Sequence, residues 1–388
     1  MFFNFRRIHK IQCVQLLTTC LVLCMVMVCW EDLDHHVVSH VRSYTYRYLV
    51  NSYEFLNSSF SVTSKHHKGK NGGGGRSYEY LINHPSKCGG DGDGKSQDNV
   101  LLLLFVKSSP ENFEQRQAIR ETWGNESLFW SELKANVKVL FALGMHPDLT
   151  WRSRVHSALL QEDQAYGDLI QQDFEDTFHN LTTKLILQFH WCHEYCPQAR
   201  FLMSADDDIF VHMPNLVKWL RSQSGAKDLW VGHVHRGSPP NRRKSSKYYV
   251  PYDLYPWPSY PDYTAGAGYV VSGDVVAKIY HATLLLKSSI YIDDVFMGIC
   301  AKAMRVSPQE HVHFSGEGKA PYHPCIYDRM ITSHGHTDVH SLWRTATNEA
   351  VYSKYRGFTG SVYCTAVRMM LLCLPYYHST YPCMAAFT

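Results

Sequence analysis

The feature that most constrains the fold is a continuous apolar run, VLLLLFV, at residues 100–106. A strand with one face in water alternates apolar and polar residues, whereas an unbroken run is typical of a strand buried on both faces of a parallel sheet. We predict strands at residues 100–106, 137–143, 169–170, 200–203 and 265–271, and helices at 111–122, 152–166 and 181–194. Strands that alternate with helices predict an α/β fold with a mostly parallel central sheet flanked by helices.

Three adjacent aspartates, Asp206, Asp207 and Asp208, follow the strand predicted at residues 200–203. In extended backbone, residues i and i+2 point to the same side, so Asp206 and Asp208 can hold one cation while Asp207 faces away. Hard divalent ions take such oxygen ligands and share them with the phosphates of a substrate. Ligands of open α/β sheets bind beyond the carboxyl ends of the strands, where this triplet falls. A solvated acidic turn or a helix N-cap remains the alternative for so short a motif.

A second acidic pair, Asp293 and Asp294, lies between apolar residues. Partial burial or a charged neighbour would raise the pKa of one carboxyl group toward neutrality, as a general base requires. The same pair is also a helix N-cap signal for a helix that begins near Val295. One aspartate can do each of these tasks, so the sequence leaves both interpretations open.

Arginines and aromatic residues supply further candidate ligands. Arg116 and Arg120 lie four residues apart on one predicted helix face, where they can meet a diphosphate or form ion pairs. Aromatic side chains crowd the segment 248–263, and they pack either against sugar rings or within the protein. These aromatic residues are Tyr248, Tyr249, Tyr252, Tyr255, Trp257, Tyr260 and Tyr263.

Histidines near the C-terminus can complete a metal shell begun by carboxylates, because a neutral imidazole is a metal ligand. The candidates are His311, His313, His323, His334, His336 and His340. The turn at residues 333–336, which contains two of these histidines, is the best candidate for the metal ligand, because its glycine frees the backbone. Most histidines in a chain with 23 of them are surface or structural residues.

The N-terminal region predicts a membrane anchor. Residues 11–30 contain no charged side chain, and about 20 such residues can cross a bilayer core as a helix. Basic residues precede this span and acidic residues follow it, so it is predicted to be an uncleaved transmembrane signal-anchor with residues 1–10 in the cytoplasm. A cleaved signal peptide is the alternative. Glycine-rich residues 31–98 are predicted to be a luminal stem, followed by the folded domain at 99–388.

Two further features agree with a luminal location. Asn57, Asn125 and Asn180 begin N-glycosylation sequons. Of the 12 cysteines, four lie in the apolar span and the remaining eight lie outside it. An even number of cysteines suits disulfides in an oxidising compartment, although the sequence does not fix their pairing.

Charge and motif content exclude several classes of function. A net charge of +3 and the lack of a Lys/Arg-rich block argue against nucleic-acid binding. The sequence contains no Walker-type P-loop, no G-x-S-x-G elbow and no H-E-x-x-H zinc motif. The acidic and aromatic motifs therefore carry the functional hypothesis.

Taken in order, these motifs resemble the β-1,3-glycosyltransferase family of Golgi enzymes, which have the GT-A fold. The matching segments span nearly all of the predicted folded domain. They are RQAIRETW at 116–123, FALG at 141–144, DF at 173–174, NLTTK at 180–184, the aspartates at 206–208, KYYV at 247–250, residues 263–272, and DDV at 293–295 with Gly298 and Cys300. Similarity to one glycolipid-acting member also covers residues 43–49, 80–84, 314–319, 322–327 and 381–383.

The resemblance implies a single-pass type II Golgi membrane glycoprotein that transfers N-acetylglucosamine from UDP-N-acetylglucosamine, in β-1,3 linkage and with inversion. The implied acceptor is the terminal galactose of lactosylceramide and neolacto-series glycolipids, and the implied cofactor is Mn²⁺ or another divalent cation. The resemblance assigns Asp206, Asp208 and His334 to the metal, with His336 as the alternative to His334. It assigns Asp294, with Asp293 beside it, to catalysis. Donor contacts are expected from Arg116, Arg120, Lys184, Asp206 and Asp207.

Some points depart from the family or stay open. Ser204 stands where the family commonly has lysine, and Thr264 where it often has cysteine, so the pairing of Cys196 is open. Galactosyl transfer by the same site, or a sugar-binding or chaperone subunit without turnover, remains an alternative function. The apolar segment 362–374 is expected to be a core helix held by its cysteines, with contact to the membrane surface as the alternative.

Overall fold

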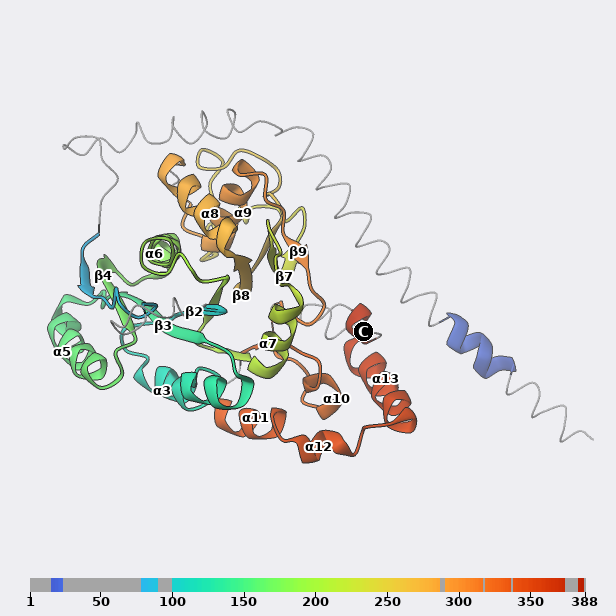
Figure 1. Ribbon diagram of the computed structural model, residues 1–388. Coiled ribbons are helices and arrows are strands. Elements are labelled where there is room, and N and C mark those ends of the chain that lie inside the picture. The colour runs from blue at the N-terminus through green and yellow to red at the C-terminus, as the bar shows by residue number, and fades with distance from the viewer. Residues whose placement is uncertain are drawn as a thin grey trace, which may run out of the picture.

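The computed structural model describes residues 15–23, 78–89, 100–286, 290–316, 318–335, 338–373 and 383–386. At its centre is an eight-stranded sheet with the order β1-β4-β3-β2-β5-β8-β7-β9 (Figure 1). Its strands are β1 (Tyr80–Ile82), β2 (Leu102–Lys107), β3 (Val137–Met145), β4 (Leu169–Glu175), β5 (Phe201–Asp206), β7 (Trp230–His235), β8 (Tyr263–Ser272) and β9 (Gln309–Glu310). Strands β4, β3, β2 and β5 run parallel, whereas β8 runs antiparallel to both β5 and β7. The predicted α/β class with a mostly parallel central sheet is confirmed.

Strand β2 shows why an unbroken apolar run belongs at the centre of this sheet. Leu103 and Phe105 pack into one apolar cluster with residues of helices α6, α8 and α9. Leu102, Leu104 and Val106 pack into a second cluster with residues of α3, α5, α7 and α11. Both faces of the strand are therefore covered by helices, which lie above and below the sheet in Figure 1.

The helices close to the sheet agree with the predicted segments. The helices are α3 (Phe113–Glu121), α4 (Glu126–Leu128), α5 (Leu149–Tyr166), α6 (Leu181–Tyr195), α7 (Met213–Ser222), α8 (Gly273–Leu285), α9 (Asp293–Ala303), α10 (Pro324–Tyr327), α11 (Val339–Ala346), α12 (Glu349–Ser353) and α13 (Phe358–Leu372). Local signals set their ends: the carboxylate of Asp148 accepts a hydrogen bond from Thr150 N at the start of α5, and Gly167 ends it with a φ of 59°.

A small two-stranded sheet positions part of the site. Strand β10 (Thr332–His334) pairs antiparallel with β6 (Ile209–Val211). The register places His334 opposite Ile209, one residue from the end of the acidic triplet. The backbone N–H of Gly335 also donates to the carbonyl oxygen of Asp208, 3.0 Å away. A C-terminal segment is thereby held against the loop that follows β5.

Residues 78–89, which the sequence analysis placed in the stem, form part of the folded unit. Strand β1 pairs antiparallel with β4 at the edge of the sheet. Cys88, beyond β1, forms a disulfide with Cys196, which answers how that cysteine pairs when Thr264 replaces a cysteine. The domain therefore includes residues ahead of the predicted boundary at residue 99.

The N-terminal predictions fall mostly outside the described residues. Residues 15–23 of the predicted anchor form a helix, whereas 11–14, 24–30 and Asn57 are not described. Among the described residues, the structure has no helix with the length and apolar character needed to span a membrane.

The C-terminal helix α13 is a surface helix, not the core helix that we expected. The outer face of this helix bears Phe358, Val362 and Met370, whose side chains are 84%, 55% and 62% exposed. A disulfide joins Cys364 in α13 to Cys325 in α10, and Cys373 just after α13 is also disulfide-bonded. Disulfides therefore attach the helix at its middle and just beyond its C-terminal end, while its outer side remains exposed.

Gly144 in β3 gives a test of the packing between β3 and β4. A Cβ atom at this position would lie 2.7 Å from the carbonyl oxygen of Phe174, so Gly144→Ala must displace backbone. We expect this substitution to lower the free energy of unfolding by about 1–3 kcal/mol, measured by denaturant unfolding. Gly89→Ala is the matched control, because its Cβ would lie an ordinary 3.6 Å from Ser86 O. Equal stability of the two variants would contradict the packing described here.

Candidate active site

A cleft of about 500 Å³ opens where β2 and β5 end and β8 begins. All three aspartates of the triplet line it, together with Asp293, Asp294 and His334. The cleft also contains the glycine-containing start of β8, around Gly266, where a Cβ would lie 3.4 Å from the Cβ of Asp294. Residues from four distant parts of the chain thus meet at the carboxyl edge of the parallel strands, as such sheets predict.

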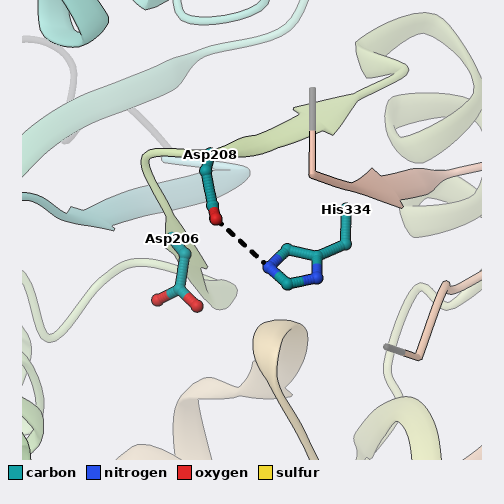
Figure 2. A group of neighbouring side chains, drawn as sticks. All are labelled: Asp206, Asp208 and His334. Atoms are coloured by element: carbon teal, nitrogen blue, oxygen red, sulfur yellow. Dashed lines mark ion pairs between the residues drawn. The ribbon is translucent and has the colours of Figure 1, made fainter. Parts of the chain in front are cut away.

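Asp206, Asp208 and His334 form a group that can hold a metal ion. One ligand atom from each lies within 4.8 Å of the others. Figure 2 shows the imidazole of His334 facing the carboxylate of Asp208, with 3.3 Å between Nε2 and Oδ2. The hydrogen bond from His334 lowers the pKa of Asp208, so this carboxylate is ionised at neutral pH. Two carboxylates and one imidazole suit Mn²⁺ and similar divalent ions.

Asp207 points away from this group, but β5 ends at Asp206, and Asp207 and Asp208 form the turn before β6 instead of the extended backbone that we expected. Its carboxylate accepts hydrogen bonds from Ser108 Oγ at 2.7 Å and from Asn112 Nδ2 at 2.9 Å. Asp207 therefore holds the loop that follows β2, which forms one wall of the cleft.

Lys107 at the end of β2 is a site residue that sequence reasoning missed. Its ammonium group lies 2.9 Å from the carboxylate of Asp206 and 2.8 Å from that of Asp293, and it donates to Gly266 O. Burial alone would lower the pKa of Lys107, but the two carboxylates raise it well above its usual value. The one signal in the sequence is that this lysine directly follows the apolar run 100–106. The structure adds that Lys107 lies opposite Asp206 in the β2–β5 register.

The two members of the second acidic pair have different surroundings. Asp293 is 7% exposed and is neutralised by Lys107. Asp294 lines the cleft, and its carboxylate accepts a hydrogen bond from the backbone N–H of Val295 at 2.7 Å. Burial, followed by the charge of Asp293, raises the pKa of Asp294 to about 7. Asp294 therefore combines access to the cleft with the pKa of a general base.

Arg116 and Arg120 occupy ion pairs inside the protein, which was the alternative to the predicted diphosphate contact. Arg116 is fully buried and pairs with Glu162 at 2.7 Å. Arg120 pairs with Glu162 and with Asp168. Neither arginine lines the cleft, and both guanidinium groups form ion pairs with carboxylates that lie outside it. The expectation of direct donor contacts is corrected on this geometry.

Lys184 lines the cleft, but its ammonium group is also engaged. It lies 2.6 Å from the carboxylate of Asp176 and donates to the carbonyl oxygen of Ser108. Arg116 donates to the hydroxyl of Ser108 and to Ser109 O. Lys184 and Arg116 therefore hold the loop after β2 in place through hydrogen bonds to Ser108 and Ser109.

The aromatic segment divides between the cleft and the core. Tyr248 is 44% exposed and lines the cleft, with Phe178 packed edge-on at 5.2 Å between ring centroids. Tyr255 and Tyr260 are buried in the core. Tyr248 is thus the member of the segment placed to contact a sugar ring.

The remaining predicted residues have structural partners. Ser204 donates to Gln188 inside the protein, and Thr264 accepts from the indole of Trp230. Asn125 caps α4 and Asn180 donates to Glu175 O, both at half-buried surface positions. His336 lies outside the described residues.

Comparison with known proteins matches residues 114–312 to the Galactosyltransferase family model. The chain is 59% identical over 391 residues to "Lactosylceramide 1,3-N-acetyl-beta-D-glucosaminyltransferase A" of Danio rerio, covering 100% of both chains. It is 55% identical to the "Lactosylceramide 1,3-N-acetyl-beta-D-glucosaminyltransferase" of Homo sapiens, with 98% of each chain covered. It is also 55% identical to the Xenopus tropicalis protein of that name, over 100% of both chains. The chain therefore belongs to the galactosyltransferase family of glycosyltransferases.

Proposed function

We propose that this chain has a GT-A fold and transfers N-acetylglucosamine from UDP-N-acetylglucosamine to the 3-hydroxyl of a terminal β-galactose. The proposed acceptors are lactosylceramide and neolacto-series glycolipids. The names of the relatives support this donor group, linkage and acceptor, and the identity extends over the full length of each relative. The arrangement of charge in the cleft supports the reaction.

The observation that carries the proposal is the unequal pairing of four of the carboxylates that line one cleft. Lys107 forms ion pairs with both Asp206 and Asp293, and His334 is paired with Asp208. Asp294 makes no ion pair among the described residues and has a pKa raised to about 7. Asp294 is therefore the carboxylate that can take a proton, whereas the other three already lie beside a basic side chain.

The proposed reaction is an inverting displacement. Asp294 accepts the proton of the galactose 3-hydroxyl as that oxygen bonds to the anomeric carbon of N-acetylglucosamine. The bond between this carbon and the diphosphate oxygen breaks at the same time, and its electron pair leaves with UDP. Asp206, Asp208 and His334 would hold a divalent cation, which supplies positive charge to the leaving diphosphate. Lys107 holds the carboxylate of Asp206 in place and opposes the rise of its pKa that burial causes.

Asp208→Asn tests the metal site separately from catalysis. The substitution removes one anionic ligand and the negative charge beside His334, so we expect Mn²⁺ affinity to fall at least tenfold. Titration calorimetry of the full chain in detergent measures this, with Asp253→Asn, an exposed aspartate, as the matched control. Unchanged Mn²⁺ affinity in Asp208→Asn would contradict the assigned ligands.

A donor and acceptor panel tests the function itself. The full chain should release UDP from UDP-N-acetylglucosamine in the presence of Mn²⁺ and lactosylceramide, and less without the acceptor. Faster reaction with UDP-galactose would replace the donor assignment. Binding of the acceptor with no UDP release from any donor would identify a subunit without turnover.

We also propose that residues 11–30 anchor the chain as a single-pass type II protein of the Golgi membrane, with the cleft in the lumen. The uncharged length of this segment, its basic N-terminal flank and the disulfides of the folded domain support this location.

A further inference from the structure

A second cavity, of about 790 Å³, lies among α10, α11, α12 and α13. It shares no lining residue with the active-site cleft. Strand β6 runs between the two: Asp208 precedes this strand and lines the cleft, whereas His212 follows it and lines the second cavity. Nothing in the proposed glycosyl transfer uses this cavity.

Positive charge predominates in the cavity wall. Arg329, Arg356 and Arg368 line it, whereas its carboxylates are those of Glu132 and Asp328. The other titratable lining residues are His212, Tyr352 and Tyr355, together with the disulfide-bonded cysteines. Burial lowers the pKa of His212 and raises that of Tyr352, so both are neutral near pH 7.

Arg368 is buried without the partners that a buried guanidinium normally has. It is 4% exposed, and its Nε has no hydrogen-bond partner. Its other groups reach only the neutral oxygens of Cys325 and Thr365, each at 3.4 Å. Within the described residues, no carboxylate forms an ion pair with Arg368 or Arg329. Burial, and then the charge of Arg329, lower the pKa of Arg368.

Arg116 shows what a structural buried arginine looks like in this same protein. It is also buried, but its guanidinium makes two 2.7 Å contacts with the carboxylate of Glu162 and further bonds to backbone oxygens. An unpaired buried charge destabilises a fold, and its persistence calls for a missing partner. The charge of Asp328 opposes the lowering of the Arg368 pKa without forming an ion pair, so an anion that enters the cavity would supply the missing partner.

We propose that this cavity binds a phosphate group, through Arg368 and Arg329. Guanidinium groups bind phosphate oxygens in pairs, and two or three of them suit a doubly charged anion better than a single carboxylate. Aromatic side chains of Trp343, Tyr352 and Tyr355 form part of the wall and can pack against the organic part of a phosphate ester.

Two sources share this chemistry: a soluble phosphate ester and the headgroup of an anionic phospholipid. The second is included because α13, which carries Arg368, exposes an apolar stripe with a spacing of four residues. The stripe is formed by Phe358, Val362, Ala366 and Met370. The stripe is offset by two residues from Arg368 and so lies on the opposite face of α13. An apolar stripe of this kind suits contact of the helix with the surface of a bilayer.

The test measures thermal unfolding of the full chain in detergent with increasing inorganic phosphate and glycerol 3-phosphate. A parallel arm compares phosphatidylcholine nanodiscs with and without phosphatidylinositol 4-phosphate. Phosphate should raise the unfolding midpoint of the unaltered chain. Arg368→Met should bind it at least tenfold more weakly, with no loss of stability in the absence of phosphate, because it removes an unpaired charge.

Arg329→Gln is the second variant, since a half-buried position tolerates substitution, and it should also weaken the response. Arg344→Gln on α11 is the matched control, because Arg344 is exposed and does not line the cavity. UDP affinity should be equal in all three variants, which separates this site from the cleft. A response to soluble phosphate or only to the phosphorylated lipid supports the site and names its source. The proposal would be overturned if neither arm gave a response. It would also be overturned if Arg368→Met and Arg329→Gln responded to phosphate as strongly as the unaltered chain.

Discussion

Replacing Asp294 with asparagine is expected to lower kcat by about 10²–10⁴-fold, the usual contribution of one general base. Asparagine keeps the size of the side chain and can still accept the hydrogen bond from Val295 N. It cannot take the proton of the galactose hydroxyl. UDP binding in the presence of Mn²⁺ should be unchanged, because the group formed by Asp206, Asp208 and His334 is intact.

The pH dependence of the unaltered enzyme gives an independent measurement of the same group. A base acts in its ionised form, and the ionised fraction of Asp294 increases as pH rises through its pKa of about 7. We therefore expect kcat/KM to rise about tenfold per pH unit below that pKa and to level off above it. In Asp294→Asn this rising limb should disappear.

Asp293→Asn is the matched control for this experiment. It changes the neighbouring carboxylate, which pairs with Lys107 and not with the acceptor, so its main effect should be on stability. Retained activity and an unchanged pH profile in Asp294→Asn, with both lost in Asp293→Asn, would transfer the role of base to Asp293.

Replacing Lys107 with methionine should have the largest effect on stability. The substitution leaves Asp206 and Asp293 without their common cation at the base of the cleft. Removing one partner of a buried ion pair typically costs about 3–5 kcal/mol, because an uncompensated charge remains. We expect the free energy of unfolding at pH 7 to fall by about that amount. Lys138→Met in β3, at a half-buried position, is the control.

The deficit of Lys107→Met should shrink in acid. Burial raises the pKa of Asp206 in the folded protein, and Lys107 opposes that rise. Without Lys107 the folded pKa rises further above the unfolded value, so the folded state binds more protons. The variant therefore keeps its stability at a pH below the pKa that Asp206 has in the unfolded chain. It loses stability as the pH rises through the higher pKa that Asp206 has in the folded variant. A deficit that stays constant between pH 7 and pH 5 would argue against unpaired carboxylates as its cause.

The strands and the candidate metal ligands could be predicted because their patterns are local. A strand buried on both faces must be apolar throughout, as β2 is, and the acidic triplet directly follows the buried residues of β5. The N-terminal boundary of the domain could not be predicted from the sequence pattern. Strand β1 is three residues long and lies beyond a glycine-rich segment, so no periodicity marked it.

The pairing of charges could not be predicted, because it depends on contacts between distant segments. Lys107 and Asp293 are 186 residues apart in sequence and meet only after β2, β5 and α9 are assembled. Arg116 and Glu162 meet across 46 residues by the same kind of packing. A basic side chain on a helix face suits a ligand or an internal carboxylate equally well, and only the fold decides between them.

The position of β1 has a consequence for how this protein behaves among its own copies. The last strand of a sheet presents unbonded N–H and C=O groups that can recruit a strand from another molecule. Here that last strand is β1, which has three residues and so presents few such groups, while it pairs with the seven-residue β4 behind it. The Cys88–Cys196 disulfide keeps the segment that follows β1 attached to the domain. A segment that the sequence alone assigns to a linker thus also limits the extension of the sheet by a strand from another molecule.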